Sequence, residues 1–226
     1  MANLSGSSEG KGGAIYVENG SSLFIYGNVS IGQNTDDSVS NTADEGGGIY
    51  NAGNTYIGMS NTSTFSEFTG FISHNQASTG GGIKNLYNLE IHSGTISANN
   101  ATISGGGIYQ YQGSYVPTLT MTGGTIDSNT CGTSGNGSGM YFESGDCLLS
   151  GTALFTNNEI YLRNGIKITV DDIFPSGTGI VATIVPYSYV GNPQVLDGSA
   201  VSTEYTHFNL QDSAYIIDSD GKIQSN

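Results

Sequence analysis

A glycine-rich strand start recurs five times along this chain, and it constrains the fold more than any other feature. Its clearest copy opens residues 80–105, GGGIKNLYNLEIHSGTISANNATISG, where three short apolar runs are separated by Gly, Asn and Ser. Each run is only a few residues long, which is typical of short strands and too short for a helix. The five copies align on the apolar residues Ile15, Ile49, Ile83, Ile108 and Met140.

A second motif alternates with the first, namely an apolar residue followed three positions later by Asn. The copies of the first motif are 34, 34, 25 and 32 residues apart, and two motifs that alternate five times indicate an internal repeat. A solenoid of strands accepts insertions in its turns, because each coil only has to stack on its neighbours. The extra residues fall in polar stretches such as 35–44, 54–64 and 110–117. We therefore predict an all-β fold, a right-handed parallel β-helix of about five to seven coils.

The repeat divides the chain into two parts. Residues 1–158 are predicted to form the β-helix repeats, after a polar lead-in that enters the first GGAI strand with no coil before it. Residues 159–226 contain longer alternating strands and lack both motifs, which predicts one or two terminal coils and a C-terminal β cap that covers the last strand edges. The lead-in favours either a piece cut from a longer secreted protein or a first coil that stacks on a neighbouring molecule.

Charge and hydropathy exclude several classes of partner. The chain has 19 acidic and 5 basic residues, a net charge of −14, and the basic residues form no cluster in the sequence. Nucleic acid and anionic membranes both require clustered Lys and Arg, so neither is expected as a partner. No run approaches the roughly 20 apolar residues of a membrane span, and the N-terminus does not resemble a signal peptide. Cys131 and Cys147 lie 16 residues apart, so they are not stacked neighbours, and their pairing is left open.

The residue after each motif isoleucine is predicted to face outward. Ile83 and Lys84 must point to opposite sides of a strand, and the lysine does not belong in an apolar core. The sequence therefore predicts an outward column made by Tyr16, Tyr50, Lys84, Tyr109 and Tyr141. Such a column either binds sugar rings or a protein partner, or consists of tyrosines that stack on one another and stiffen the sheet.

The asparagines of the second motif are predicted to form a structural ladder. Stacked, buried Asn side chains can hydrogen-bond to one another and to turn carbonyls where the chain changes direction. The predicted members are Asn34, Asn75, Asn99, Asn129 and Asn157.

No catalytic residue and no cofactor are predicted. Polysaccharide lyases and hydrolases share this architecture, but they need a placed base or carboxylates paired on one strand face. Here the adjacent acid pairs point apart in a strand, and His74, His92 and His207 occupy unrelated positions in the repeat. The acidic first insertion, with Asp36, Asp37, Asp44 and Glu45, is a weak calcium candidate, and a solvated loop is the preferred interpretation.

The two motifs resemble those of the polymorphic outer-membrane protein family of chlamydiae and related bacterial surface repeats, where GGA(I/L/V) alternates with FxxN. Residues 12–15 (GGAI) and 155–158 (FTNN) match them, and the other copies are GGGI and IxxN variants. Residues 159–226 look like the cap of glycine-rich right-handed β-helix proteins of gut and oral bacteria. The resemblance implies an exported adhesin.

From the repeat and the resemblance we expect a non-enzymatic, extracellular bacterial surface protein that binds a host protein or glycan through one β-helix face. The alternative is a subunit that stacks end to end on copies of itself into fibres. A polysaccharide lyase or hydrolase is the third interpretation.

Overall fold

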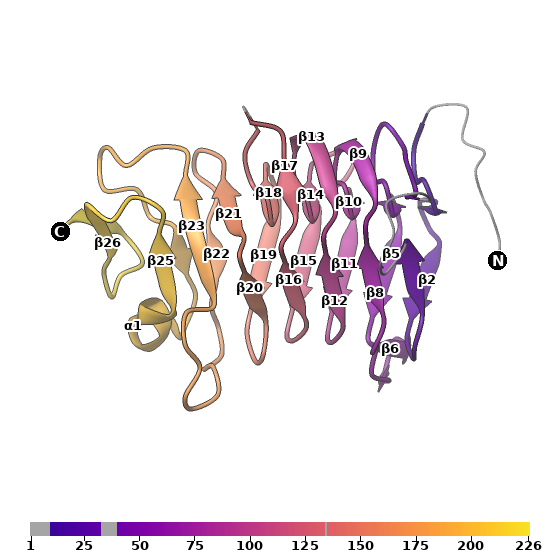
Figure 1. The fold of residues 1–226 in the computed structure, drawn as a ribbon. Helices are drawn as coiled ribbons and strands as arrows, with labels where there is room; N and C mark the ends of the chain where they lie inside the picture. The colour runs from indigo at the N-terminus through magenta and orange to yellow at the C-terminus, as the bar shows by residue number, and fades with distance from the viewer. Residues whose placement is uncertain (1–9, 33–39, 134) are drawn as a thin grey trace.

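The structure is a computed structural model that describes residues 10–32, 40–133 and 135–226. The described chain is nearly all-β, with parallel strands stacked from the N-terminal to the C-terminal end (Figure 1). Its helical elements are the short helix α1 (Val201–Glu204) and the 3-10 helix η2 (Tyr205–His207), both near the C-terminus. The predicted all-β class is confirmed, and the stacked parallel strands are compatible with the predicted β-helix.

Three parallel sheets hold most of the strands. The first sheet contains, in order, β1 (Ile15–Val17), β4 (Ile49–Asn51), β10 (Ile83–Asn85), β14 (Ile108–Gln110), β18 (Met140–Phe142), β21 (Glu159–Leu162), β23 (Ala182–Pro186) and β25 (Phe208–Leu210). The second contains β2 (Ser22–Ile25), β5 (Asn54–Ile57), β11 (Asn88–Ile91), β15 (Thr118–Met121), β19 (Asp146–Leu149), β22 (Ile168–Thr169) and β24 (Leu196–Asp197). The third contains β3 (Ser30–Gly32), β8 (Phe71–Ser73), β12 (Thr95–Ser97), β16 (Thr125–Asp127) and β20 (Leu154–Thr156).

The chain visits these sheets in a fixed order. Up to β20 it passes from the first sheet to the second and the third, and then returns to the first sheet one strand further along. A small fourth sheet, of β9 (Gln76–Thr79), β13 (Asn100–Ser104) and β17 (Thr130–Cys131), precedes the return in the middle repeats. Each repeat therefore pairs with the one before it and the one after it.

The register of the first sheet confirms the alignment of the glycine-rich motifs. Ile49 pairs with Ile15 and with Ile83, and Ile108 pairs with Ile83 and with Met140. All of these except Ile15 are completely buried, whereas Ile15 is partly buried. Because strand side chains alternate between the two faces, burying this position places the next residue on the outer face of the sheet.

The strands that follow residue 158 continue the same sheets. β21, β23 and β25 extend the first sheet, and β22 and β24 extend the second. An antiparallel pair, β26 (Tyr215–Ile217) and β27 (Ile223–Ser225), follows at the C-terminal end. The division at residue 158 stays a prediction. The insertion at 54–64 is not only loop, because it contains β5, β6 (Met59–Asn61) and the first residue of β7 (Thr64–Phe65), which pairs antiparallel with β6.

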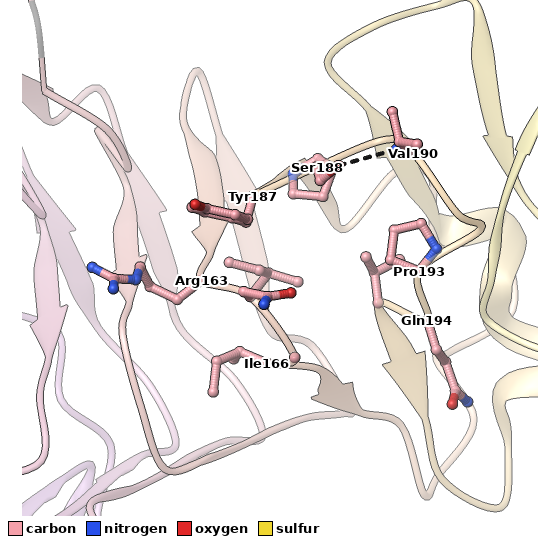
Figure 2. Close-up of a pocket in the computed structure, with 12 residues that line it drawn as sticks. Arg163, Ile166, Tyr187, Ser188, Val190, Pro193 and Gln194 are labelled. Carbon is pink, nitrogen blue, oxygen red and sulfur yellow. Dashed lines mark hydrogen bonds between the residues drawn. The ribbon is translucent and has the colours of Figure 1, made fainter.

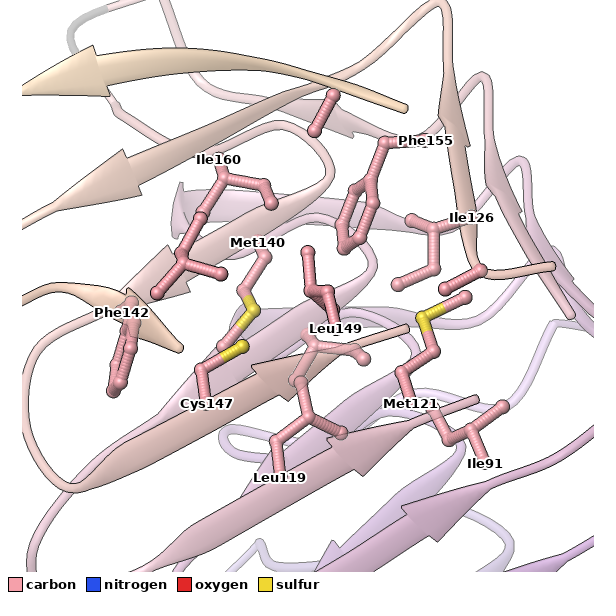
Figure 3. Packing of buried hydrophobic residues seen from close by; sticks show 14 of the residues in the cluster. Ile91, Leu119, Met121, Ile126, Met140, Phe142, Cys147, Leu149, Phe155 and Ile160 are labelled. Atoms are coloured by element: carbon pink, nitrogen blue, oxygen red, sulfur yellow. The ribbon is translucent and has the colours of Figure 1, made fainter. Parts of the chain in front are cut away.

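The two cysteines belong to different sheets and are free thiols. Cys147 lies in β19 of the second sheet and is completely buried, and Cys131 lies at the end of β17 in the fourth sheet and is partly exposed. Figure 3 shows Cys147 in the core beside Met140 and Leu119. Burial raises the pKa of the Cys147 thiol to about 12, with a smaller contribution from Asp146, so this thiol stays protonated at neutral pH.

The different burial of the two thiols predicts a difference in reactivity. In the native protein at pH 8, a water-soluble disulfide reagent is expected to modify Cys131 and leave Cys147 unmodified until the chain unfolds. Burial and Glu159 also raise the pKa of Cys131, so its reaction should be slower than that of a free thiol. The measurement is the labelled mass with and without denaturant, with Cys131→Ser as the control. Equal native-state rates for the two thiols would contradict this packing.

Candidate functional site

The outer face of the first sheet carries a column of aromatic residues. The register places Tyr16, Tyr50, Lys84, Tyr109, Tyr141 and Tyr161 side by side in successive strands, and we call this set the tyrosine column. It contains all five residues of the predicted outward column and one that the repeat pattern missed, Tyr161. Tyr161 was missed because β21 lacks the glycine-rich start.

The rings of the tyrosine column stack on one another. The centroids of Tyr16 and Tyr50 are 5.1 Å apart with their planes at 5°, and those of Tyr109 and Tyr141 are 5.0 Å apart at 2°. Tyr161 continues the stack 5.0 Å from Tyr141. Because each ring covers its neighbour, Tyr50 and Tyr141 are only 6% and 9% exposed. The faces of these rings are therefore used inside the column, which favours the stiffening role over direct stacking on a sugar.

Lys84 occupies the position of a ring in this column and is itself buried. Its ammonium forms an ion pair with Glu45 and donates to Thr79 Oγ1 at 3.2 Å. It also lies over two rings, 5.1 Å from the centroid of Tyr109 and 5.4 Å from that of Tyr111. Burying an ammonium is unfavourable unless it is paired, and the carboxylate and the two rings supply that pairing.

The Lys84 and Glu45 pair predicts a measurable coupling. Lys84→Met should lower the free energy of unfolding by about 2 kcal/mol, because it leaves Glu45 partly buried without its partner. In Lys84→Met with Glu45→Gln, part of that loss should be recovered, giving a coupling energy of about 1 kcal/mol. Urea unfolding of the two single variants and the double variant measures it. Strictly additive effects would show that the two side chains do not interact.

Three of the five basic residues of the chain lie on this face. Lys11 lies 5.5 Å from the ring centroid of Tyr50, and Arg163 Nη1 donates to the Tyr141 hydroxyl at 3.4 Å. Lys84 is the third. In a chain with a net charge of −14, the outer face of the first sheet therefore holds most of the basic residues, two of them paired with Glu45 and Glu143. The basic residues form no cluster along the sequence, and only the stacking of distant strands brings these three to one face.

A second outward row runs beside the tyrosine column. It lies two residues further along each strand, and we define the flanking row as Tyr111, Glu143, Arg163 and Tyr187. Backbone hydrogen bonds hold its members in register, since Glu143 N donates to Gln110 O at 3.1 Å and Arg163 N donates to Phe142 O at 3.0 Å. The end rings remain open to solvent, with Tyr111 40% and Tyr187 59% exposed.

The two charged members of the flanking row form hydrogen bonds with tyrosines of the tyrosine column. The hydroxyl of Tyr109 donates to the Glu143 carboxylate, and Arg163 Nη1 lies 3.5 Å from Glu143 Oε1. Burial raises the pKa of Tyr109 well above its usual value, and the hydrogen bond to Glu143 raises it further, so this hydroxyl stays protonated. The carboxylate of Glu143 is thus held in place as a hydrogen-bond acceptor beside an exposed guanidinium.

A small hollow adjoins the C-terminal end of this row. It has a volume of about 70 Å³ and lies between the turns at 163–166 and 187–195. Figure 2 shows that the side chains of Arg163 and Tyr187 extend to the same side, away from Pro193 and Gln194 on the opposite side of the hollow. These two side chains therefore belong to the outer face of the first sheet.

Three of the predicted ladder asparagines stack inside the turn that follows the third sheet. Asn75 Nδ2 donates to Asn99 Oδ1 at 2.9 Å, and Asn99 Nδ2 donates to Asn129 Oδ1 at 2.9 Å. All three are buried. The ladder continues to Asn158, whose Oδ1 accepts from Asn129 Nδ2 at 3.0 Å. Asn34 lies outside the described residues.

The placement of Asn157 in the ladder was wrong by one residue. The strand register pairs Ile126 with Phe155, so the residue three positions after the core position is Asn158. Asn157 is exposed at the corner, with a φ of 50°, and donates to Asp127 Oδ1 at 2.9 Å. The prediction failed because it took Leu154 as the core residue, whereas the FxxN match begins at Phe155 and ends at Asn158.

The structure contains a second ladder of amide side chains, which was not predicted from the sequence. Asn51 Nδ2 donates to Asn85 Oδ1 at 2.8 Å, and Asn85 Nδ2 donates to Gln110 Oε1 at 3.1 Å. All three side chains are completely buried where the first sheet turns toward the second. The signal was present, since an amide follows two residues after the motif isoleucine in GGGIYN, GGGIKN and GGGIYQ.

The acidic residues do not assemble into a metal site in the part of the chain that the structure describes. Asp36 and Asp37 lie outside the described residues, Asp44 is exposed, and Glu45 is engaged by Lys84. No group of three His, Cys, Asp or Glu that could hold a metal ion occurs among the described side chains. The three histidines also stay apart, with His92 beside Thr122 and Glu90, His207 beside Glu204, and His74 in the turn after the third sheet.

No helix in the described ranges is long and apolar enough to cross a membrane. Compared with protein-family models, with curated proteins and with solved structures, the chain matches none.

Proposed function

We propose that this chain is a right-handed parallel β-helix that acts as a non-enzymatic, adhesin-like binding scaffold on the outside of a bacterial cell. The β-helix is supported by the fixed order in which the chain visits three parallel sheets, with each motif residue paired to its copy in the next repeat. Export to the cell surface is favoured by the GGAI and FxxN motifs, which resemble those of surface adhesins.

The observation that carries the binding function is the make-up of the outer face of the first sheet. That face combines stacked tyrosines, three of the five basic residues and the flanking row, whose two end tyrosines are exposed. Aromatic and Arg side chains are enriched at binding surfaces because they contribute a large contact area at a low entropic cost. A host protein or a glycan fits this mixture of rings and paired charges, whereas nucleic acid would require an excess of cations.

Binding by the purified chain tests this function. Labelled protein is titrated onto immobilised host cells, extracellular-matrix proteins and a glycan array, with an Arg163→Ala, Tyr187→Ala double variant as the comparison. We expect saturable binding to at least one of these targets that the double variant weakens by about tenfold. Absence of saturable binding to all of them would refute the adhesin-like function. Turnover of a polysaccharide by the chain would instead favour the lyase or hydrolase interpretation.

A second candidate function is end-to-end assembly with copies of this chain. It is favoured by the groove of about 510 Å³ beside β25, the last strand of the first sheet, which is lined in part by Phe208, Leu210, Tyr215 and Ile216, with Ile216 47% exposed. Light scattering over a concentration series separates the candidates. A constant mass near 23.4 kDa excludes assembly, and a mass that rises with concentration supports it.

A further inference from the structure

We propose that the flanking row, Tyr111, Glu143, Arg163 and Tyr187, is a binding site for a segment of an uncharged oligosaccharide. This inference rests on the proposed binding function and narrows it to one ligand class and four side chains.

The row has the dimensions of a short sugar chain. Its four members come from four successive strands of the first sheet, β14, β18, β21 and β23 or the turns that follow them. Neighbouring strands are about 4.8 Å apart, so the row extends over about 14 Å along the stacking direction. An extended oligosaccharide lying along the row would meet one side chain at each strand.

The order of side chains in the row suits a sugar chain. Each end has an exposed tyrosine, Tyr111 at 40% and Tyr187 at 59% exposure, and the apolar face of a pyranose ring packs on such rings. Between them lie a carboxylate that accepts hydrogen bonds and a guanidinium that donates them, and sugar hydroxyls can do both. These exposed rings, rather than the covered rings of the tyrosine column, provide the stacking surfaces.

The row is preorganised by the tyrosine column beside it. The rings of Tyr109, Tyr141 and Tyr161 stack alongside the row, and hydrogen bonds from the hydroxyl of Tyr109 and to that of Tyr141 hold Glu143 and Arg163. The loop that carries Tyr111 is fixed to the next turn by Gln112 N, which donates to Ser144 Oγ at 2.6 Å. Groups already held in the bound geometry lose little entropy when a ligand binds.

The charges of the row and of the whole chain favour uncharged sugars over acidic ones. Glu143 and Arg163 form a pair 3.5 Å apart, so the row itself has no net charge. The chain around it has a net charge of −14, which disfavours the approach of a polyanion. Lys84, the nearest other cation on this face, is already paired with Glu45. An uncharged glycan has no such repulsion to overcome, and its hydroxyls can bond to both charged members.

Calorimetric titration with defined oligosaccharides tests this inference. The probes are glucan, galactan, mannan and xylan fragments of about four to six sugars, with oligogalacturonate and heparin fragments as charged comparators. We expect at least one uncharged fragment to bind, and Tyr187→Ala and Tyr111→Ala each to weaken it by about tenfold. Tyr26→Ala is the matched control, because Tyr26 is 50% exposed in the turn after β2 and should leave the affinity unchanged.

The outcomes separate this inference from the broader proposal. Loss of affinity in both flanking-row variants, with the control variant unaffected and circular dichroism unchanged, supports the site. Binding of charged fragments only, or equal affinity in wild type and both variants, overturns it. If the chain binds host cells or matrix proteins saturably but binds no uncharged fragment, the oligosaccharide site is refuted and the adhesin-like function stands. Failure of all binding refutes both.

Discussion

Replacing Asn99 with alanine is expected to lower the free energy of unfolding by about 3 to 5 kcal/mol. Asn99 is completely buried, and its Nδ2 donates to Ile72 O and to Asn129 Oδ1, each at 2.9 Å. Its Oδ1 accepts from both the backbone N and the Nδ2 of Asn75. The substitution would therefore leave several buried polar groups without partners, and each such group costs about 1 to 3 kcal/mol. Urea unfolding followed by circular dichroism measures the loss.

Asn157 provides the matched control for this prediction. Asn157→Gly should change the free energy of unfolding by less than about 1 kcal/mol, because the residue is exposed and glycine tolerates its positive φ. Asn158→Ala should be clearly more destabilising, because Asn158 accepts from Asn129 and donates to Asn129 O at 2.8 Å. A larger effect at Asn157 than at Asn158 would show that the ladder ends one residue earlier than the structure places it.

Gly81→Ala is expected to be the second severe change, with a loss of at least about 3 kcal/mol. A Cβ at this position would lie 2.6 Å from the carbonyl oxygens of Asn100 and Gly106. Both contacts are backbone atoms of stacked turns, so no side-chain rotation relieves them. For a chain of this size, 3 kcal/mol corresponds to a melting temperature lower by roughly 6 to 12 °C. Thermal denaturation followed by circular dichroism provides the measurement.

Gly179 is the control for the glycine substitution. A Cβ on Gly179 would meet no heavy atom within 4 Å, and its φ is not in the left-handed region. Gly179→Ala should therefore leave the melting temperature within about 2 °C of that of the wild-type protein. If Gly81→Ala were tolerated equally well, successive turns would have to be further apart than the structure places them.

The glycine-rich motif predicted the repeat correctly because closely stacked turns restrict which residues fit at them. Where successive turns approach closely, only glycine fits, and the next residue begins a strand whose apolar side chain enters the core. The pairing of Ile83 with Ile49 and Ile108 follows from aligning three copies of one motif. The same alignment found most of the tyrosine column, since the residue after an inward isoleucine must face outward.

Other features of the site could not be predicted, because they depend on side chains beyond the motif. The flanking row comes from turns of variable length, and its four members are two tyrosines, a glutamate and an arginine at unequal spacing, so no sequence pattern marks them. Tyr161 lies in β21 and Tyr187 directly follows β23, and neither strand has the glycine-rich start of the repeat. The ladder was misplaced at its last member because Leu154 and Phe155 are both apolar, and the register that selects Phe155 is set by pairing with β16.

The sequence by itself determined the all-β class, the repeat and the inward or outward direction of the motif residues, because strand alternation and turn sterics are local. Tertiary structure alone decided that the tyrosine rings cover one another, that Lys84 pairs with Glu45, and that Lys11 and Arg163 join the same face. These contacts join residues from different repeats. They follow from the lengths of all the intervening turns, which set how each strand lies against the next.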